Sequence, residues 1–412
     1  MFKLALLGLG TVGAGVYEII NNKKGNFFMN SDVRIDKILV RDKTKKRNVS
    51  VDETLLTDNF EDILNSEEVK IVISVMGGLE PELTYIKKSL SAGKNVVTAN
   101  KEIIAKHIDE LMALAKENGV NILFEASVGG GIPIINSLLE TIKINKISKI
   151  QGILNGTTNY ILTKIQKEKM DFDEVLKIAQ DIGFAEADPT ADVEGFDVLR
   201  KISILASLSF KTVVKEEDVH RRGISNVTLS DILMAKEYGY IVKYLGQAIL
   251  ENDGYSVSVT PVLIKKASVI SNVNEEYNIV LINGNIIGEL CFMGKGAGKD
   301  ATANAVVSDI INIINGDVNY SHVNFDADVH SSGLEGIRNR YYIRASVENF
   351  EEFSDTLDLV MDTVKKSSLK YAQDKVFFIT EELNSIDMKA LYEKLQKASK
   401  NVFYARLEDN LL

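Results

Sequence analysis

The stretch FKLALLGLGTVGAGVY, residues 2–17, decides the fold of this chain. It opens with a short apolar run, after which Gly8, Gly10 and Gly13 follow at the spacing G-x-G-x-x-G. Glycines at this spacing allow a tight turn and a close approach of the backbone to a pyrophosphate, which then rests on the N-terminus of the next helix. The stretch therefore predicts a strand, a dinucleotide-binding turn and a helix that runs to about residue 22.

Strands and helices continue to alternate through the N-terminal third. The apolar runs predict further strands at residues 33–40, 71–75, 95–98 and 120–124, and the later helices are predicted near residues 82–92 and 103–118. This alternation is typical of an α/β fold with a doubly wound, Rossmann-type parallel sheet. Ligands of such sheets bind beyond the carboxyl ends of the strands, so residues 75–78 and 98–101 are predicted to lie at the cofactor edge.

The segment after the second predicted strand bears on the choice of cofactor. A site selective for NAD usually places an acidic residue there, where it binds the ribose hydroxyl groups. Here Arg41 comes first, with Asp42 and four basic residues behind it. Arg41 and a nearby lysine are suited to a 2′-phosphate, so the sequence favours NADP. A solvated basic loop is the alternative, and Asp42 leaves the use of NAD open.

The composition argues against several classes of protein. The 58 acidic and 48 basic residues give a net charge of −10, which disfavours a nucleic acid or an anionic membrane as the main partner and favours a soluble, cytoplasmic protein. No uncharged run approaches the length of a membrane span, and the four histidines lack the spacing of zinc or iron ligands. The single cysteine, Cys291, has apolar neighbours and is expected to be a buried, unreactive thiol.

Two polar turns follow the predicted fifth strand. Residues 125–133 contain three glycines before Pro133, so their carbonyl groups are able to face inward as a monovalent cation requires, although a tight structural turn is the simpler interpretation. Residues 151–160 are predicted to be the end of a strand, a turn and the start of a helix. Thr157 lies at this helix start, where it suits either a cap or a substrate contact.

A turn-rich, acidic segment at residues 183–195 leads into a predicted helix that carries no charge from Ile202 to Phe210. Asp197 and Lys201 stand four residues apart and project from one face of this helix. An ordinary ion pair is the common meaning of such spacing. At the edge of apolar surroundings, however, desolvation makes a lysine ammonium a better proton donor, while an adjacent carboxylate keeps it charged and oriented.

Five motifs, taken together, resemble the homoserine dehydrogenase family. They are GLGTVGAGV at residues 8–16, TANK at 98–101, EASVGGGIP at 125–133, GILNGTTNYIL at 152–162 and GFAEADPTADVEGFDVLRK at 183–201. Their order and spacing match the family, and the resemblance extends to about residue 320. It implies the reversible, NAD(P)-dependent oxidation of L-homoserine to L-aspartate 4-semialdehyde, in threonine and methionine biosynthesis.

The resemblance also implies roles for individual residues. Lys201 would donate or accept the proton at the substrate oxygen, with Asp197 and Lys101 as the other catalytic residues. Substrate would be bound by Glu186, Asp197, Thr157 and Lys101. A sodium ion would be held by the backbone oxygens of Glu125, Val128, Gly130 and Ile132. Cofactor would be bound by Gly8, Gly10, Thr11, Val12, Gly13, Arg41, Thr98, Lys101, Gly183 and Gly298.

The second half of the chain predicts a mixed or antiparallel sheet followed by a smaller module. Strands are expected at residues 240–250, 255–263, 277–282 and 286–292, and in the family this sheet also forms the dimer interface, which makes a homodimer or homotetramer the expected assembly. A second glycine-rich loop at residues 293–302 would return the chain to the first domain through a helix at residues 303–314.

The expected domains follow from this order. Residues 1–135 and 300–320 would form the dinucleotide-binding domain, residues 136–299 the α+β substrate and dimerisation domain, and residues 321–340 a linker. Residues 341–412 are predicted to be β-α-β-β-α-β, a ferredoxin-like unit that resembles an ACT domain. The Asp-x-Pro-Gly effector turn of ACT domains is missing at residues 347–352, so strong feedback by threonine is not expected.

Two other functions compete with this interpretation. One is another reductase of amino-acid semialdehydes with the same fold, and the lack of an active-site cysteine argues against acyl-phosphate chemistry. The other is a cofactor-bound amino-acid sensor without turnover, against which the pair formed by Asp197 and Lys201 speaks.

Overall fold

A computed structural model describes most of the chain. The described residues are 2–21, 33–47, 49–251, 254–317, 320, 323–325, 329–333, 338–347, 350–358, 360–372, 374–399 and 401–409. They form two compact units. The first contains Met1–Ile150, Arg200–Glu216 and Val280–Val329, and the second contains Gln151–Leu199, Glu217–Ile279 and His330–Leu412.

The first unit contains a six-stranded, wholly parallel sheet in the order β3-β2-β1-β4-β5-β6. This is the strand order of a Rossmann fold, so the predicted fold class is confirmed. The strands are β1 (Phe2–Leu7), β2 (Val33–Leu39), β3 (Leu56–Thr57), β4 (Val69–Ser74), β5 (Asn95–Thr98) and β6 (Ile122–Leu123). The helices among them are α1 (Thr11–Asn21), α2 (Glu61–Leu64), α3 (Glu82–Ser91), α4 (Lys101–Glu117) and α5 (Ile134–Thr141).

The hydrophobic pattern explains which of these elements the sequence predicts. The central strands β1 and β4 are covered by helices on both faces, so they need uninterrupted apolar runs, and Leu4 to Leu7 are fully buried. The strand β3 has only two residues and carries no recognisable pattern, so the sequence predicts neither this strand nor the single-turn helix α2. The strand predicted at residues 120–124 is shorter than expected, because only Ile122 and Leu123 pair with β5.

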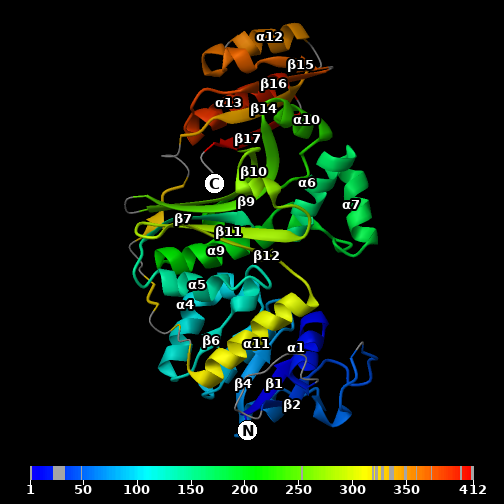
Figure 1. The fold of residues 1–412 in the computed structure, drawn as a ribbon, viewed down its shortest axis with the longest axis vertical. Coiled ribbons are helices and arrows are strands. Elements are labelled where there is room, and N and C mark those ends of the chain that lie inside the picture. The colour runs from blue at the N-terminus through cyan, green and yellow to red at the C-terminus, as the bar shows by residue number, and fades with distance from the viewer. Residues whose placement is uncertain are drawn as a thin grey trace. The chain divides into compact units, whose positions relative to one another are not determined.

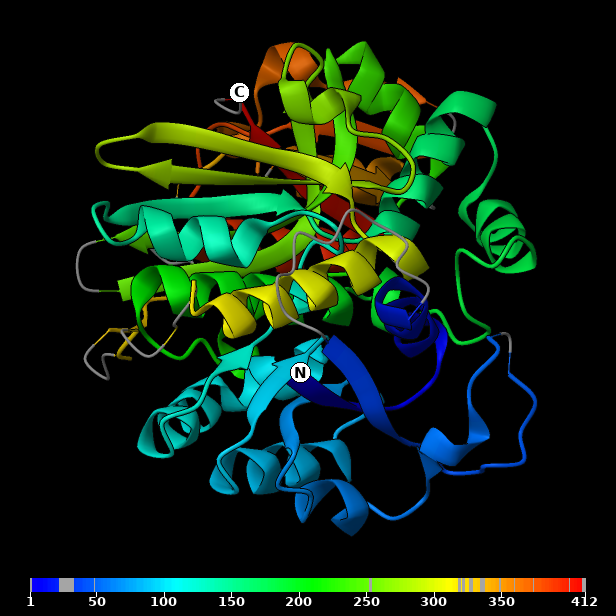
Figure 2. The ribbon, with the colours of Figure 1, turned by 60° about the horizontal axis from the view of Figure 1, so that its bottom comes forward.

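The helix α11 (Lys299–Asn315) completes the first unit, and Figures 1 and 2 show it in yellow beside α1. A Cβ atom on Gly15 of α1 would lie 2.8 Å from the Cβ atom of Ala303. The two helices therefore pack at a distance that only a glycine permits. The helix predicted near residues 303–314 is therefore part of the first unit.

The helix α9 (Phe196–Phe210) is buried along most of its length. From Lys201 to Phe210 every residue is buried, on all sides of the helix rather than on one face. A helix that is apolar all round belongs to the interior of a protein, as the uncharged run from Ile202 to Phe210 indicates.

The second sheet has eleven strands, nine of them in the order β12-β11-β7-β9-β10-β17-β14-β16-β15, with β8 and β13 paired to β10. Its strands are β7 (Ile147–Ile153), β8 (Val219–Arg221), β9 (Tyr240–Glu251), β10 (Gly254–Lys265), β11 (Tyr277–Gly284), β12 (Gly288–Lys295), β13 (His330–Ser331), β14 (Tyr341–Ser346), β15 (Lys370–Ala372), β16 (Lys375–Ile379) and β17 (Val402–Glu408). The accompanying helices are α6 (Gly156–Glu168), α7 (Phe172–Asp181), α8 (Thr190–Val193), α10 (Leu229–Glu237), α12 (Phe350–Asp358) and α13 (Ser385–Ala398).

The C-terminal segment has the predicted order β14-α12-β15-β16-α13-β17. Its strands lie in the spatial order β17-β14-β16-β15, and all three pairs are antiparallel, so each helix links two strands that have a third strand between them. This is the split β-α-β arrangement of a ferredoxin-like unit. In addition, β17 pairs in parallel with β10, which joins this segment to the larger sheet. Of the effector turn considered above, Glu348 and Asn349 lie outside the described residues, as does much of the predicted linker.

In the predicted β-α-β-β-α-β order, the sequence pattern places the first helix at residues 351–366, and this length is wrong. The helix α12 ends at Asp358, and two short 3-10 turns follow at Met361–Thr363 and Lys366–Ser368. Val360 and Val364 stand four residues apart, which mimics helical spacing, but both enter the hydrophobic core from this irregular segment. Two apolar residues four positions apart can therefore both be buried without belonging to one continuous helix.

Cys291 is exposed, so the expectation of a buried thiol is wrong. Cys291 lies in β12, the last strand at one end of the sheet. Successive residues of a strand point to opposite faces, so the apolar neighbours Leu290 and Phe292 say nothing about the surroundings of the thiol.

Among the helices that the structure describes, none combines the length and apolar character needed to cross a bilayer.

A buried ion pair links α10 to the C-terminal sheet within the second unit. The Arg344 Nε atom lies 2.9 Å from Asp231 Oδ1, and both side chains are almost inaccessible to solvent. The same carboxylate accepts hydrogen bonds from the Tyr342 hydroxyl at 2.9 Å and from the Thr228 backbone at 2.9 Å. Because Asp231, Tyr342 and Arg344 are buried, each relies on the others for hydrogen bonds.

We expect the substitution Asp231→Ala to destabilise the second unit by about 3–5 kcal/mol, because it leaves the Arg344 guanidinium buried without its carboxylate. The matched control is Glu168→Ala, which removes the half-exposed i,i+4 pair with Lys164 and should cost less than about 0.5 kcal/mol. Urea unfolding followed by circular dichroism measures both. Equal losses for the two variants would contradict the account of the buried pair.

Candidate active site

The glycine turn lies at the carboxyl ends of β1, β2 and β4. The Gly8 N–H donates a hydrogen bond to the Leu39 carbonyl at 3.0 Å, and Gly8 has a φ of +95°, which favours glycine. A Cβ atom on Gly13 would lie 2.2 Å from the Gly8 carbonyl oxygen, whereas a Cβ atom on Gly10 would meet nothing within 4 Å. Two of the glycines are thus required by the fold itself. Gly10 faces open space at the N-terminus of α1, where a pyrophosphate fits. It is followed by the exposed Thr11 and the partly exposed Val12.

A buried carboxylate organises the adjoining ends of β4 and β5. Glu82 is fully buried and accepts hydrogen bonds from Ser74 Oγ at 2.7 Å, the Gly77 N–H at 2.7 Å and Asn100 Nδ2 at 2.9 Å. The Asn100 side-chain oxygen in turn caps α4, whose first residue is Lys101. The buried Thr98 hydroxyl accepts from the Asn100 N–H at 3.0 Å. The backbone on both sides of Lys101 is therefore fixed by a carboxylate that the sequence analysis did not single out.

The basic segment after β2 is exposed to solvent, and Arg41 is its first residue. The Asp42 carboxylate accepts hydrogen bonds from the Thr44 N–H at 2.8 Å and from the Thr44 hydroxyl at 2.7 Å. These hydrogen bonds lower the pKa of Asp42. The acidic group at this edge is thus engaged within its own turn, and the Arg41 side chain is exposed beside it.

The glycine loop after β6 rests on two buried carboxyl groups. The Glu125 side chain accepts hydrogen bonds at 2.8 Å from the N–H groups of both Ile135 and Asn136 at the start of α5, and its own N–H donates to Asp309 at 2.9 Å. Burial raises the pKa of Glu125 to about 7, and burial together with the charge of Glu125 raises the pKa of Asp309. The side chain of Glu125 is therefore used to hold the loop, which leaves only its carbonyl oxygen for a cation.

The same loop lies against the second glycine-rich segment. Gly130 has a φ of +57°, and a Cβ atom there would lie 2.5 Å from the Gly296 carbonyl carbon, while the Gly131 N–H donates to the Lys295 carbonyl at 3.1 Å. These contacts bring the loop close to Gly298, the exposed residue that precedes α11. Val128 and Ile132 are buried in the loop.

No metal site built from side chains is found among the described residues, because nowhere in them do three histidine, cysteine, aspartate or glutamate side chains meet. A cation held by carbonyl oxygens is a different arrangement. It stays a prediction of the sequence, as do the roles assigned to the individual residues.

In the second unit the structure joins the helix start that carries Thr157 to the turn that carries Glu186. The Thr157 hydroxyl, at the start of α6, donates a hydrogen bond to the Phe184 carbonyl at 3.0 Å, directly after Gly183. Gly183 has a φ of +78°, and Glu186 is exposed three residues further on. The Gln180 side chain holds this turn through the Glu186 carbonyl at 3.2 Å, so the Glu186 carboxylate extends from an anchored backbone.

Asp197 and Lys201 lie one turn apart on α9, and both are less than a tenth exposed. Asn155 links Asp197 to Asp192, and the sequence pattern predicts no role for Asn155 or Asp192. The Asn155 side chain donates hydrogen bonds to Asp192 Oδ1 at 2.7 Å and to Asp197 Oδ2 at 2.9 Å. Both residues stand within the quoted family motifs, but their spacing in the sequence gives no sign that they meet.

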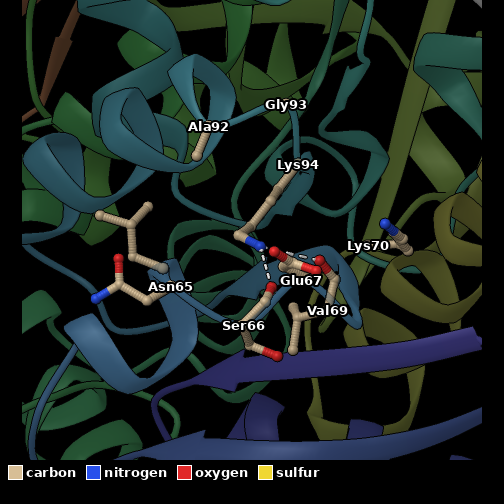
Figure 3. A pocket seen from close by; sticks show the side chains of 9 residues that line it. Asn65, Ser66, Glu67, Val69, Lys70, Ala92, Gly93 and Lys94 are labelled. Carbon is tan, nitrogen blue, oxygen red and sulfur yellow. Dashed lines mark hydrogen bonds between the residues drawn. The ribbon is translucent and has the colours of Figure 1, made fainter.

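Figure 3 shows a cavity in the first unit that lies away from the glycine turn. Its volume is about 380 Å³, and the Lys94 ammonium in its wall donates to the carbonyls of Ser66 at 2.6 Å and Val69 at 3.1 Å. Lys94 directly precedes β5 and Val69 begins β4, so the cavity lies at the amino ends of these strands. Cofactors bind at the opposite edge of such sheets.

A redox reaction of this kind needs a cofactor site and a substrate site, and the geometry of each unit suits one of them. The first unit offers a glycine turn open to a dinucleotide and a basic group beside it. The second offers paired carboxylates, a threonine and an exposed glutamate, which are the groups that suit a small zwitterionic substrate.

Comparison with known proteins gives a consistent result. The family model described as "Homoserine dehydrogenase, NAD binding domain" matches residues 8–125, and the model described as "Homoserine dehydrogenase" matches residues 133–311. A homoserine dehydrogenase of Bacillus subtilis (strain 168) is 46% identical over 314 residues, which cover 76% of this chain and 72% of the relative.

Solved structures agree with these matches. A homoserine dehydrogenase from Thiobacillus denitrificans has a TM-score of 0.87 at 33% identity, with 99% of this chain and 98% of that chain covered. A hyperthermophilic archaeal homoserine dehydrogenase mutant, solved in complex with NADPH, has a TM-score of 0.65 at 27% identity, with 77% of this chain and 99% of that chain covered.

The glycine turn yields a paired prediction. Gly10→Ala should leave the melting temperature of the protein unchanged, because the added methyl group meets no protein atom, yet it should weaken NADPH binding at least tenfold by blocking the approach of the pyrophosphate. Gly13→Ala should lower the melting temperature as well, because its methyl group collides with the Gly8 carbonyl. Fluorescence titration with NADPH and thermal melting measure the two effects. Unchanged NADPH affinity in Gly10→Ala would contradict the assignment of the turn.

Proposed function

The chain belongs to the homoserine dehydrogenase family, and we propose the residues with which it interconverts L-homoserine and L-aspartate 4-semialdehyde. The family matches support this reaction, and neither a different semialdehyde reductase nor a sensor without turnover finds support in them. A nicotinamide cofactor supplies or accepts the hydride. The protein must therefore bind the substrate, orient it and move one proton at the substrate oxygen.

Lys201 is proposed to move that proton. In the reductive direction negative charge grows on the aldehyde oxygen, and a nearby ammonium both stabilises this charge and delivers the proton. In the oxidative direction the neutral amine accepts the proton of the homoserine hydroxyl. The observation that carries the proposal is the position of Lys201, which is buried directly before the uncharged run Ile202–Phe210 of α9 and one turn after the buried Asp197. Such a carboxylate keeps the lysine oriented.

The remaining polar groups are proposed to hold the substrate. The exposed carboxylate of Glu186 suits the substrate ammonium group as a counter-charge, and Thr157 stands at the start of α6 with its hydroxyl on the adjoining turn. Lys101 adds a second ammonium group at the cofactor edge of the first unit. Gly183 and Gly298, which are exposed and have a positive φ, allow close approach of the cofactor.

The substitution Lys201→Ala should lower kcat by about 10²–10⁴-fold, because it removes the group that moves the proton. NADPH affinity should stay within about threefold of the wild-type value. Steady-state turnover of L-homoserine with NADP, followed by the absorbance of the reduced cofactor, measures kcat, and fluorescence titration measures binding. A variant that keeps wild-type turnover, or one that loses NADPH binding instead, would sink the proposed role.

The cofactor is proposed to be NADP, with NAD as a weaker alternative. The support is the exposed guanidinium of Arg41 directly after β2, together with the engagement of the Asp42 carboxylate by Thr44. An arginine fork matches a 2′-phosphate, whereas a ribose hydroxyl needs an acceptor.

Arg41→Ala should therefore raise KM for NADP about tenfold and change KM for NAD by less than twofold, since only NADP carries the 2′-phosphate. The matched control is Lys46→Ala, which removes a second exposed cation of the same segment. Equal effects of Arg41→Ala on both cofactors would reduce Arg41 to a solvated loop residue.

A sodium ion at the carbonyl groups of Glu125, Val128, Gly130 and Ile132 also belongs to the proposal. The support is that the loop is anchored through the Glu125 side chain, which leaves carbonyl groups to serve as ligands. Turnover that is equally fast in sodium and in tetramethylammonium buffer would count against it.

A cytoplasmic location follows from the composition alone and stays a prediction.

A homodimer is proposed to form through the region around β12. Four large apolar side chains near this terminal strand are at least half exposed, namely Ile144, Ile286, Ile287 and Met293. Apolar side chains gathered at one end of a sheet are typical of an interface between subunits.

Ile286→Lys should accordingly convert the dimer to a monomer in sedimentation velocity, because a lysine ammonium cannot be buried there without a partner. Ile386→Lys is the matched control, since Ile386 is similarly exposed but lies on α13 in the C-terminal segment. An Ile286→Lys protein that sediments like the wild type would contradict this interface.

A further inference from the structure

Asn155 occupies a junction that the established reaction does not explain. It follows β7 by two residues and precedes α6, with φ −133° and ψ 120°, as an N-cap residue has. Its side chain is 95% buried, whereas N-cap side chains commonly lie at the surface. The burial indicates that the side chain has contacts beyond those of a helix cap.

Those contacts are two carboxylates from two other helices. The Asn155 amide nitrogen donates to Asp192 Oδ1, on α8, at 2.7 Å and to Asp197 Oδ2, in the first turn of α9, at 2.9 Å. The Asn155 side-chain oxygen accepts from the Thr158 N–H at 2.8 Å. One side chain thus joins three helices of the second unit.

The orientation of this amide is fixed by its partners. A primary amide has two N–H donors on one side and an acceptor on the other. If the group were rotated by half a turn, its oxygen would face two carboxylates and its nitrogen would face the Thr158 N–H, so neither interaction would survive. Asn155 therefore permits one arrangement of Asp192 and Asp197, in which both carboxylates converge on a single nitrogen atom.

The carboxylates of Asp192 and Asp197 repel each other, so their convergence on one nitrogen atom costs electrostatic energy. Two carboxylates that share one donor lie within a few ångströms of each other. Asp197 is buried and Asp192 is partly buried, so their repulsion is screened less than in bulk water. A neutral bridge with two N–H groups offsets this repulsion without adding charge. Loss of this bridge removes one source of compensation, so we expect the two carboxylates to move further apart and the orientation of Asp197 relative to Lys201 to change.

We propose that Asn155 is a positioning residue for the dehydrogenase reaction, which orients Asp197 toward proton transfer by holding it against Asp192. This proposal rests on the proposed role of Asp197 beside Lys201. Asn155 does not touch the reacting atoms, and it acts through the carboxylates. Because the same side chain caps α6, it also ties the turn that carries Thr157 to the carboxylate pair.

The competing explanation is that Asn155 serves only as a structural helix cap. The two explanations predict different effects when the asparagine is replaced. As N-cap residues, asparagine, aspartate and serine are nearly equivalent. Asn155→Ser keeps a cap, but its short side chain cannot reach both carboxylates. Asn155→Asp keeps the cap and the size, but it replaces both donors with a third carboxylate.

The experiment measures steady-state kinetics of both variants in the whole protein, in both directions, with thermal melting and NADPH titration alongside. We expect kcat to fall about tenfold in Asn155→Ser and about a hundredfold in Asn155→Asp, as displacement of a catalytic group by about 1 Å would cause. KM for NADPH should change by less than twofold. The primary isotope effect with deuterated NADPH should rise in both variants, because the chemical step becomes slower.

The control is Asn384, whose side chain caps α13 in the C-terminal segment by accepting from the Asp387 N–H at 2.8 Å. Asn384→Ser and Asn384→Asp should leave kcat and the isotope effect unchanged. If both Asn155 variants keep wild-type kcat, the positioning role is wrong. It is also wrong if their kcat falls only together with the melting temperature and NADPH affinity.

Lys201→Ala in the same assay separates this inference from the proposal beneath it. If Lys201→Ala loses turnover while the Asn155 variants keep it, only the role of Asn155 fails. If Lys201→Ala keeps turnover, the role of the Asp197 and Lys201 pair fails first.

Discussion

Charged groups inside a protein must be compensated, and α9 is built around this constraint. The helix is buried along its whole course from Lys201 to Phe210, yet it begins with a carboxylate and an ammonium group one turn apart. Burial of either charge alone would be costly, so their neighbours are restricted to groups that hydrogen-bond to them. For Asp197 one such neighbour is Asn155, and this contact brings Asp192 and the start of α6 into the same cluster. Groups that suit the proposed proton transfer thus lie together at the N-terminal, polar end of α9.

The same principle operates at the cofactor edge of the first unit. Glu82 is fully buried and satisfies donors from the end of β4, from the following turn and from Asn100. Glu125 is buried likewise and holds its glycine loop to the start of α5. In both places a buried carboxylate fixes the backbone of a turn or loop that follows a strand of the parallel sheet. Rigid support of this kind is what positions loops accurately enough for catalysis.

Much of the fold is predictable from the sequence, because hydrophobic period and glycine spacing are local signals. The parallel sheet, α9 and the order of elements in the C-terminal segment all follow from such patterns. The failures arise where a local pattern has two structural meanings. The valines at 360 and 364 have helical spacing without a helix, and Cys291 points away from its apolar neighbours because strand residues alternate. The candidate site is less predictable. Asn155, Asp192 and Glu82 owe their importance to partners distant in the sequence, which no spacing reveals.

The proposed reaction depends on Lys201 meeting the oxygen atom at which the proton moves. A crystal structure of the protein with NADP and L-homoserine tests this directly. We expect the Lys201 Nζ atom within hydrogen-bonding distance of the homoserine hydroxyl, with the Asp197 carboxylate beside it and still held by Asn155. A homoserine hydroxyl bound by other groups, with Lys201 outside contact, would contradict it.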